Sequence, residues 1–426
     1  MKIKRVEAFQ IYDSRGKPTV ECTVTMENGA VGSGFVPSGA STGRTEALEL
    51  RDRDPRRLRG DAVFSAVRNI EGEIAPVVEG MDVFDQEAVD DTMCDLDGTV
   101  NKSRLGGNAI LAVSMAVAKA AAAVDRVPLF HYLGGGREYL MPMPQIQLFG
   151  GGAHSAWRTD IQDFLVIPVG AEDFPQSLEI THNVYHAAGD WMREHKKYFG
   201  VADEGGYWPE FDSHTQVLDA VMKCIELAGY TPGKDVAIAL DVAASELYDG
   251  ALYRFSLEDR ALSRDELLGL FMAWCANYPI VSLEDPFSDQ DPDGWASIRS
   301  ELGDRIQLIG DDLFTTNIHL IEKGVERNLA NAVLIKPNQI GTLTETLAAI
   351  RLTQASSWRP VVSARSGETE DTFISHLAVA TNAGQIKVGS FARSERMAKW
   401  NELLRIERCL SKKNAVFAGR KIVEPR

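Results

Sequence analysis

Cysteines are few in this sequence, and none of them stands in a CxxC pair. The five cysteines are scattered over 426 residues, which disfavours a zinc site of paired thiolates and a disulfide scaffold. Buried thiols in a reducing compartment are the simpler interpretation. Long hydrophobic runs are also lacking: there is no stretch of eighteen apolar residues, and the N-terminus reads as a strand rather than a signal peptide. We therefore expect a soluble, cytoplasmic protein with no membrane partner.

An excess of positive charge is lacking as well. The chain carries 45 Lys and Arg against 61 Asp and Glu, for a net charge of −16. A nucleic-acid partner requires a basic face, so this balance excludes that class of partner. A small anionic substrate remains compatible, because acidic side chains can recruit a divalent metal ion that then binds the anion.

What the sequence does contain begins with an α+β pattern over residues 1–130. Alternating apolar and polar residues with turn signals predict a three-stranded antiparallel meander over 2–13, 18–29 and 30–37. Helical periodicity follows over 61–79 and over the alanine-rich stretch 106–124. These elements predict a first, compact domain, followed by a second domain over 131–426.

The second domain repeats one unit. Short apolar runs end in a charged residue at intervals of about 25 residues, with helical stretches between them, which is the length of one strand, one helix and two loops. The first interval is longer and contains a polar excursion over 246–264. The residues that close the runs are Asp241, Glu284, Asp311, Lys336, Arg365 and Lys387.

Parallel repeats of this kind can close into a barrel or lie as an open sheet. An open sheet places its ligand at one switch point, often with a glycine fingerprint, and no GxGxxG motif follows any predicted strand. Charged residues at the ends of six successive strands favour a barrel, in which chemistry converges on one rim.

Three of the rim residues predict a metal site. Asp241, Glu284 and Asp311 end successive strands, and oxygen ligands without sulfur or imidazole suit Mg²⁺. Lys336 and Lys387 follow on the same rim. Because nearby metal cations disfavour a lysine's charged form, one of these amines can act as a base near neutral pH. Such a site suits proton abstraction beside a carboxylate.

The chain resembles the enolase family through motifs that run in enolase order from about residue 3 to 420. They are YDSRGKPTVE, VPSGASTG, DEGGYWP, SLEDPF, GDDLFTTN, KPNQIGT, SGETEDTF and ARSERMAKWNELLRIE. The resemblance implies an α/β protein with an N-terminal α+β lid domain and a modified (β/α)8, TIM-like barrel. It further implies two Mg²⁺ ions, the second bound with the substrate, and a homodimer or higher homo-oligomer.

Site residues carry over by position. The resemblance makes Asp241, Glu284 and Asp311 the ligands of the first Mg²⁺, and Ser38 in the mobile PSGAST loop the ligand that reaches the second. Lys336 corresponds to the catalytic base.

The remaining positions surround the substrate. Glu204 corresponds to the acid that helps hydroxide leave from carbon 3, and Lys387 to the lysine that holds the substrate carboxylate. Arg365 and Ser366 correspond to the phosphate clamp. Two residues match the family's second mobile loop, His154 and Gln162.

Four positions depart from the enolase pattern. Gly150 replaces an asparagine, Asp163 stands where enolases have the glutamate that partners the DEGG acid, and Ala364 replaces a histidine beside Arg365. Arg158 adds a cation to the second loop. Together the changes predict a roomier pocket within reach of one extra positive charge.

That pocket favours the hypothesis of a specialised paralogue, a carboxyphosphonoenolpyruvate synthase of phosphonate antibiotic biosynthesis. Its substrate would be a phosphonylated three-carbon acid, whose additional carboxylate would occupy the space beside Ala364 and pair with Arg158. The alternatives are ordinary glycolytic enolase, which acts on the phosphorylated acid 2-phosphoglycerate, and a non-catalytic binding role. The retained metal carboxylates, both lysines and Glu204 speak against the last.

Overall fold

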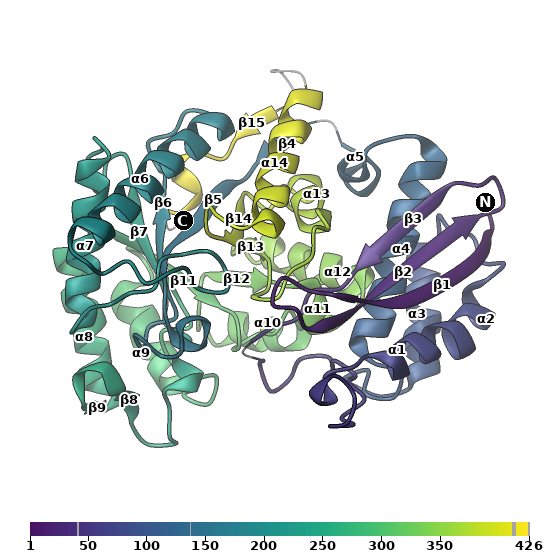
Figure 1. Cartoon of the computed structure of the whole chain (residues 1–426), viewed down its shortest axis with the longest axis horizontal. Helices are drawn as coiled ribbons and strands as arrows, with labels where there is room; N and C mark the ends of the chain where they lie inside the picture. Colours follow the sequence, from purple (N-terminus) through teal and green to yellow (C-terminus); the bar gives the residue numbers. More distant parts are fainter. Residues whose placement is uncertain (41, 137, 411–414, 425–426) are drawn as a thin grey trace.

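The computed structural model describes residues 1–40, 42–136, 138–410 and 415–424, and it places a three-stranded sheet with its helices beside a closed barrel (Figure 1). Strands β1 (Ile3–Tyr12), β2 (Pro18–Met26) and β3 (Val31–Phe35) form the predicted antiparallel meander. Alternate residues of β2 are buried against a helix, as the alternating pattern requires.

That helix is α4 (Gly107–Asp125), which crosses the sheet at very short range. A Cβ atom at Gly32 would lie 2.2 Å from the backbone nitrogen of Ala120, and one at Gly34 would lie 2.5 Å from the carbonyl oxygen of Ala112. The close packing of α4 on the sheet therefore requires both the glycines of β3 and the alanines of α4. By length and composition α4 could cross a membrane, but 83% of its apolar window is buried inside the protein, as in a core helix.

The other helices of this region depart in part from the sequence-based prediction. The expected helix over 61–79 is composite: α1 (Phe64–Asn69), a π-helical turn (Ile70–Ile74) and α2 (Ala75–Val78). Helix α3 (Gln86–Asp97) was not predicted, although Asp85 caps its first turn and Gly98 ends it with a positive φ.

Eight strands close the barrel in the order β10-β11-β12-β13-β14-β5-β6-β7. Strand β6 runs antiparallel to both neighbours and the remaining pairs are parallel, which confirms a TIM-like barrel of modified topology. The sequence predicted only the six later strands, because the first two form an antiparallel pair outside the repeat. The strands are β5 (Met143–Gly150), β6 (Asp163–Ile167), β7 (Ala237–Asp241), β10 (Ile280–Glu284), β11 (Gln307–Gly310), β12 (Ala332–Ile335), β13 (Arg359–Ser363) and β14 (Gln385–Gly389).

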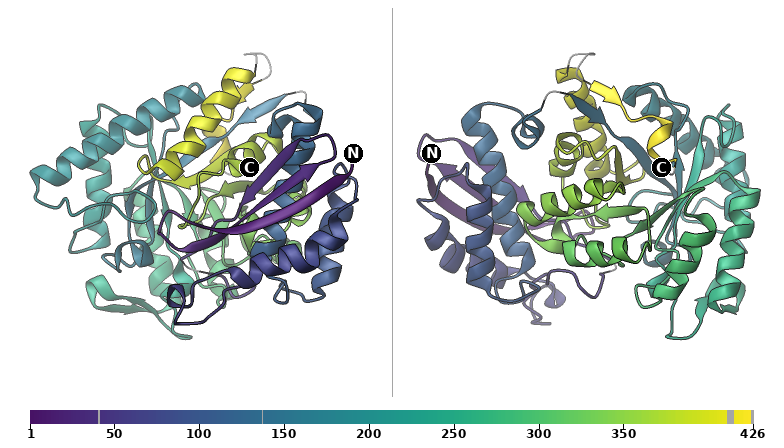
Figure 2. Two further views of the ribbon diagram at one scale, coloured as in Figure 1. Left: turned by 45° about the vertical axis from the view of Figure 1, so that its right-hand side comes forward. Right: turned by 180° about the vertical axis from the view of Figure 1, so that it is seen from behind.

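Helices cover the outside of the barrel, and α11 and α12 also contact the N-terminal helices, which joins the two regions (Figure 2). The polar excursion over 246–264 contains a hairpin of β8 (Tyr253–Phe255) and β9 (Arg260–Leu262). A short parallel pair, β4 (Tyr139–Met141) with β15 (Ala415–Phe417), lies outside the barrel. The helices are α5 (Leu129–Gly134), α6 (Phe174–Glu194), α7 (His214–Leu227), α8 (Arg264–Asn277), α9 (Pro292–Leu302), α10 (Ile318–Glu326), α11 (Pro337–Ile340), α12 (Leu343–Ala355), α13 (Phe373–Ala380) and α14 (Ser394–Cys409).

Candidate active site

The three predicted metal carboxylates meet at one rim of the barrel. Asp241 and Glu284 are the last residues of neighbouring strands β7 and β10 and are paired in register. Asp311 directly follows β11. All three are buried, because parallel strands end at the same edge and the loops beyond them cover that edge.

Two lysines neutralise this cluster. Lys387 Nζ lies 2.6 Å from Asp241 Oδ2 and 2.9 Å from Glu284 Oε2. Lys336 Nζ forms an ion pair with Asp311 Oδ2. Burial alone would lower the pKa of Lys336, but the Asp311 carboxylate raises it above its ordinary value. The protein's own charges therefore hold Lys336 protonated, opposite to the direction expected from neighbouring metal cations.

The donor set fits a divalent cation. Glu284 Oε1 is a buried oxygen with no hydrogen-bond partner among the described residues. Burial and then the neighbouring Asp241 raise the pKa of Glu284 well above its ordinary value. A buried carboxylate oxygen without a hydrogen-bond partner is stabilised strongly by a hard cation such as Mg²⁺.

A second carboxylate group lies close by. Asp285, Asp311 and Asp312 each have an oxygen within 4.8 Å of the others. The Asp285 carboxylate, however, accepts the backbone N–H groups of Asp311 (2.9 Å) and Asp312 (2.8 Å). Asp285 therefore orients the loop that carries Asp311.

The predicted acid–base residues face the cluster from the other side. Asp163 Oδ2 lies 3.3 Å from Lys387 Nζ, and His154 Nε2 lies 4.0 Å from Glu204 Oε1. Burial raises the pKa of Asp163 to about 6, with Glu204 adding to the rise. Burial acts on Glu204 too, but the charges of His154, Arg396 and the lysines outweigh it and lower the pKa of Glu204. The pKa values of Asp163 and Glu204 therefore shift in opposite directions, as they do in sites where two carboxyl groups take different roles in proton transfer.

The predicted phosphate clamp follows β13. The Arg365 guanidinium lies 3.0 Å from Glu46 Oε2 and 3.0 Å from Asn338 Oδ1. Arg15 Nη1 donates to the Ser366 hydroxyl at 3.3 Å. No pattern in the sequence pointed to a role for Glu46, Asn338 or Arg15, although Arg15 stands within the YDSRGKPTVE motif.

Gln162 and Ala364 line the cavity of the site. Gln162 Nε2 donates to Asp241 Oδ2 at 2.9 Å, and Ala364 lines the same cavity. Nothing in the structure explains the alanine at position 364.

Two predicted residues are not brought to the site. The Ser38 hydroxyl donates to Glu49 Oε2 at 3.0 Å, and its backbone pairs with Gly367. In this structure the side-chain oxygen of Ser38 is directed at Glu49 and Arg51, so its assignment as the ligand that reaches the second Mg²⁺ stays a prediction. Ser41, in the same motif, lies outside the described residues.

Arg158 is the second. Its guanidinium forms an ion pair with Glu210 and lies 5.3 Å from the ring centroid of Trp208 and 5.6 Å from that of Phe199. A carboxylate and two aromatic faces compete successfully for the cation. In this structure Arg158 therefore lies away from the phosphate clamp, and its role in binding substrate stays a prediction.

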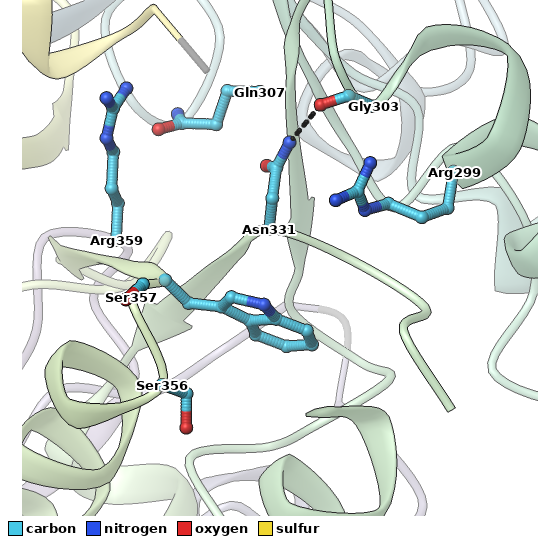
Figure 3. Close-up of a pocket in the computed structure, with 8 residues that line it drawn as sticks. Arg299, Gly303, Gln307, Asn331, Ser356, Ser357 and Arg359 are labelled. Carbon is cyan, nitrogen blue, oxygen red and sulfur yellow. Dashed lines mark hydrogen bonds between the residues drawn. The ribbon is translucent and has the colours of Figure 1, made fainter. Parts of the chain in front are cut away.

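The residues of the site enclose a small cavity of about 20 Å³, lined by His154, Gln162, Asp163, Glu204, Asp241, Lys336, Ala364, Arg365, Ser366 and Lys387. A larger cavity of about 190 Å³ lies at the opposite, N-terminal ends of the strands, around Gln307 and Arg359. In it, Asn331 donates to the carbonyl of Gly303 at 2.9 Å, and the Arg299 guanidinium points toward Asn331 (Figure 3). Chemistry in TIM-like barrels belongs to the C-terminal rim, so the smaller cavity is the candidate site.

Comparison with known proteins agrees with this geometry. Residues 3–133 match the model for the enolase N-terminal domain, and residues 138–426 match that for the enolase C-terminal TIM barrel domain. The protein named Enolase 1 from Desulfitobacterium hafniense (strain Y51) is 53% identical over 412 residues, which cover 96% of this chain and 94% of the relative. Enolase from Anaplasma marginale (strain St. Maries) is 49% identical over 416 residues, covering 98% and 96%.

These relatives overturn the hypothesis of a carboxyphosphonoenolpyruvate synthase. Proteins about half identical over nearly their full length bear the plain name enolase, which favours the alternative of an ordinary enolase. The structure removes one support of the hypothesis as well, since Arg158 is paired elsewhere. The comparisons therefore do not support a phosphonylated substrate or a role in antibiotic biosynthesis.

Proposed function

The chain belongs to the enolase family, and we propose that it catalyses the reaction of ordinary glycolytic enolase, the conversion of 2-phosphoglycerate to phosphoenolpyruvate. It is a carbon–oxygen lyase of the hydro-lyase class, and its substrate is a phosphorylated three-carbon acid. Its cofactor is Mg²⁺, with a second ion that binds together with the substrate.

The observation that carries the proposal is the meeting of three buried carboxylates with two lysines at one rim. Asp241, Glu284 and Asp311 would hold the first Mg²⁺. Bound Mg²⁺ supplies positive charge where the substrate carboxylate gains negative charge as its neighbouring carbon loses a proton.

The protein side chains divide the remaining work. We assign Lys336 as the base that removes the proton from carbon 2, since a cation bound at the carboxylates lowers the pKa of an adjacent lysine. Lys387 would hold the substrate carboxylate, and Arg365 with Ser366 the phosphate. By the resemblance, Glu204 would protonate the hydroxyl that leaves carbon 3. Because the pKa of Glu204 is lowered, its proton would come by way of Asp163, whose pKa is raised to about 6, with His154 assisting.

The direct test follows the ultraviolet absorbance of the forming enol double bond with 2-phosphoglycerate and Mg²⁺. We expect turnover that a chelator abolishes and that Mg²⁺ restores. Lys336→Ala should lower kcat by about a hundredfold to ten-thousandfold, the range of a lost general base. Lys323→Ala, an exposed lysine on α10, is the matched control and should be unaffected. Absence of turnover by the parent enzyme would refute the proposal, and an intact kcat in Lys336→Ala would refute the assigned base.

For assembly, we propose a homodimer. Strand β1 is an edge strand of its sheet. Its first residues bond to the segment 79–82, and further along it exposes half or more of the Phe9 and Tyr12 side chains, at 50% and 57%. An exposed edge strand with aromatic residues favours pairing with a second chain. Light scattering of the parent protein and of a Phe9→Ser/Tyr12→Ser variant tests this, with loss of the dimer expected in the variant.

For location, we propose the cytoplasm. All five cysteines are free, and Cys22 and Cys224 are buried, as expected of thiols kept in a reducing compartment. Fractionation of the source cells, followed by detection of the protein, tests this proposal.

A further inference from the structure

Gln147, a residue of strand β5, links the two acidic groups of the site. Its Nε2 donates to Asp163 Oδ1 at 2.5 Å, and its Oε1 accepts the backbone N–H of Gly206 at 2.9 Å. Gly206 lies two residues after Glu204 in the DEGG segment. One buried amide therefore joins the Asp163 carboxylate to the turn that carries Glu204.

The space around this amide depends on two glycines. A Cβ atom at Gly206 would lie 2.6 Å from Gln147 Oε1, and one at Gly150 would lie 3.0 Å from Gln147 Nε2. A side chain at Gly206 would push the amide away from its partners, and one at Gly150 would meet both the Cβ atom of Ala202, at 2.7 Å, and the amide. Gly150 is one of the positions at which this chain departs from the enolase pattern.

The backbone also directs Gln147 toward the site. The pairing of β5 with β6 is irregular between Gln147 and Phe149: Gln147 pairs with Leu165, and Phe149 pairs with Phe164. A bulge of this kind bends a strand and changes the direction of the side chains beside it. It brings the Gln147 amide within reach of Asp163, at the start of β6.

We propose that Gln147 is a positioning residue that compensates for the short side chain of Asp163. The inference rests on the proposed enolase reaction and goes beyond it. Aspartate lacks the methylene of the glutamate that enolases carry here, a difference of about 1.5 Å in reach. Gln147 fixes Asp163 Oδ1, which leaves Oδ2 3.3 Å from Lys387 and without a hydrogen bond to any described residue.

The same link explains two of the four departures together. The extended Gln147 amide fills the volume that a longer residue at 163 would enter and that an asparagine at 150 would need. Gln147, Gly150 and Asp163 therefore form one interlocking set that preserves the positions of the acidic groups. These changes do not require a different substrate.

The test is a set of single and double substitutions assayed with 2-phosphoglycerate and Mg²⁺. Asp163→Glu alone drives the carboxylate against the amide, and we expect kcat to fall about a hundredfold, the cost of a misplacement near 1 Å. Gln147→Asn alone withdraws the amide from both partners and should lower kcat with little change in KM, because the phosphate and metal contacts remain.

The double variant Gln147→Asn/Asp163→Glu restores the combined length, and we expect its kcat to exceed that of Asp163→Glu about tenfold or more, a coupling typical of residues in contact. Gln145→Asn is the matched control, since Gln145 is an equally buried glutamine of β5 that bonds to Gln385 instead. Gln145→Asn should not rescue Asp163→Glu.

If the fold-losses in kcat of the two single variants simply multiplied in the double variant, the inference would be overturned. An unchanged kcat in Gln147→Asn would also overturn it. Unfolding free energies of the parent, the single variants Gln147→Asn and Asp163→Glu and their double variant, measured in urea, give a second test that does not depend on activity. If the parent enzyme did not turn over 2-phosphoglycerate, the proposed function would fail, but coupled unfolding free energies would still support the link. Additive unfolding free energies would overturn it independently.

Discussion

Lys387 Nζ lies 2.6 Å from Asp241 Oδ2, so an ammonium group pairs directly with one of the carboxylates that we assign to Mg²⁺. The same ammonium contacts Glu284 at 2.9 Å and Asp163 at 3.3 Å. The cluster is thus a site for positive charge, and its stability depends on how much positive charge it receives.

This relationship predicts how Mg²⁺ acts on stability. At a concentration of one hundred times its Kd, a ligand of the folded state stabilises it by about 2.7 kcal/mol. Glu284→Gln should abolish most of the Mg²⁺-dependent rise in Tm. Without Mg²⁺ its Tm should equal or exceed that of the parent, because the substitution removes a buried charge with a raised pKa. Differential scanning calorimetry with and without Mg²⁺ measures both effects; an unaltered Mg²⁺ response would argue against Glu284 as a ligand.

The ion pair of Arg158 with Glu210 predicts a small effect on catalysis. Both side chains are about one-third exposed, and such pairs contribute roughly 0–1 kcal/mol to stability. We expect Arg158→Ala to leave the KM for 2-phosphoglycerate unchanged. Arg365→Ala provides the contrast, with a strong rise in KM expected from loss of the phosphate clamp. A large rise in KM for Arg158→Ala would show that this cation does reach the substrate.

Buried His214 predicts a large effect on stability away from the site. Its Nδ1 lies 2.8 Å from Glu258 Oε1, and its Nε2 lies 3.2 Å from Asp160 Oδ2. His214 Nε2 also accepts the backbone N–H of Asp160 at 3.2 Å. Leaving buried hydrogen-bonding groups without a partner costs about 1–3 kcal/mol, so His214→Ala should lower the unfolding free energy by that order in urea titrations. The control is His319→Ala, whose side chain is exposed and lies 3.5 Å from Glu322. Equal losses of unfolding free energy in His214→Ala and His319→Ala would contradict a stabilising role for the contacts of His214.

Glu402 predicts an acid-dependent contribution. A hydrogen bond from His376 lowers the pKa of Glu402 to about 2, from an ordinary value of 4.5, with Arg405 assisting. Because the pKa of Glu402 is lower in the folded state, its carboxylate stabilises the folded protein above about pH 4.5. This stabilisation is lost as the pH falls toward 2. We expect the Tm difference between the parent and Glu402→Gln to shrink over this interval. A difference that is constant with pH would contradict it.

Much of the site was predictable because it depends on strand ends. Asp241, Glu284, Asp311, Lys336 and Lys387 each end or follow an apolar run, and parallel strands deliver such residues to one rim whatever the details of packing. The repeat length similarly predicted six of the eight barrel strands. The first two were missed because β6 runs antiparallel and breaks the repeat.

Ser38 and Arg158, the two predicted residues that this structure does not bring to the site, lie outside the helices and the barrel strands. Ser38 turns to Glu49, and Arg158 turns to Glu210, because each finds a nearer partner on a segment remote in sequence. Spacing along the chain holds no information about such competition.

The sequence by itself determined the family, the barrel with its N-terminal α+β region, and the rim at which metal and lysines meet, since these depend on periodicity and strand polarity. Only the tertiary structure decided which polar groups satisfy one another. Gln147 gained its role from a bulge, two glycines and a short carboxylate brought together from β5, β6 and the DEGG turn. A hydrogen bond requires atoms within about 3 Å, and only the folded chain sets that distance.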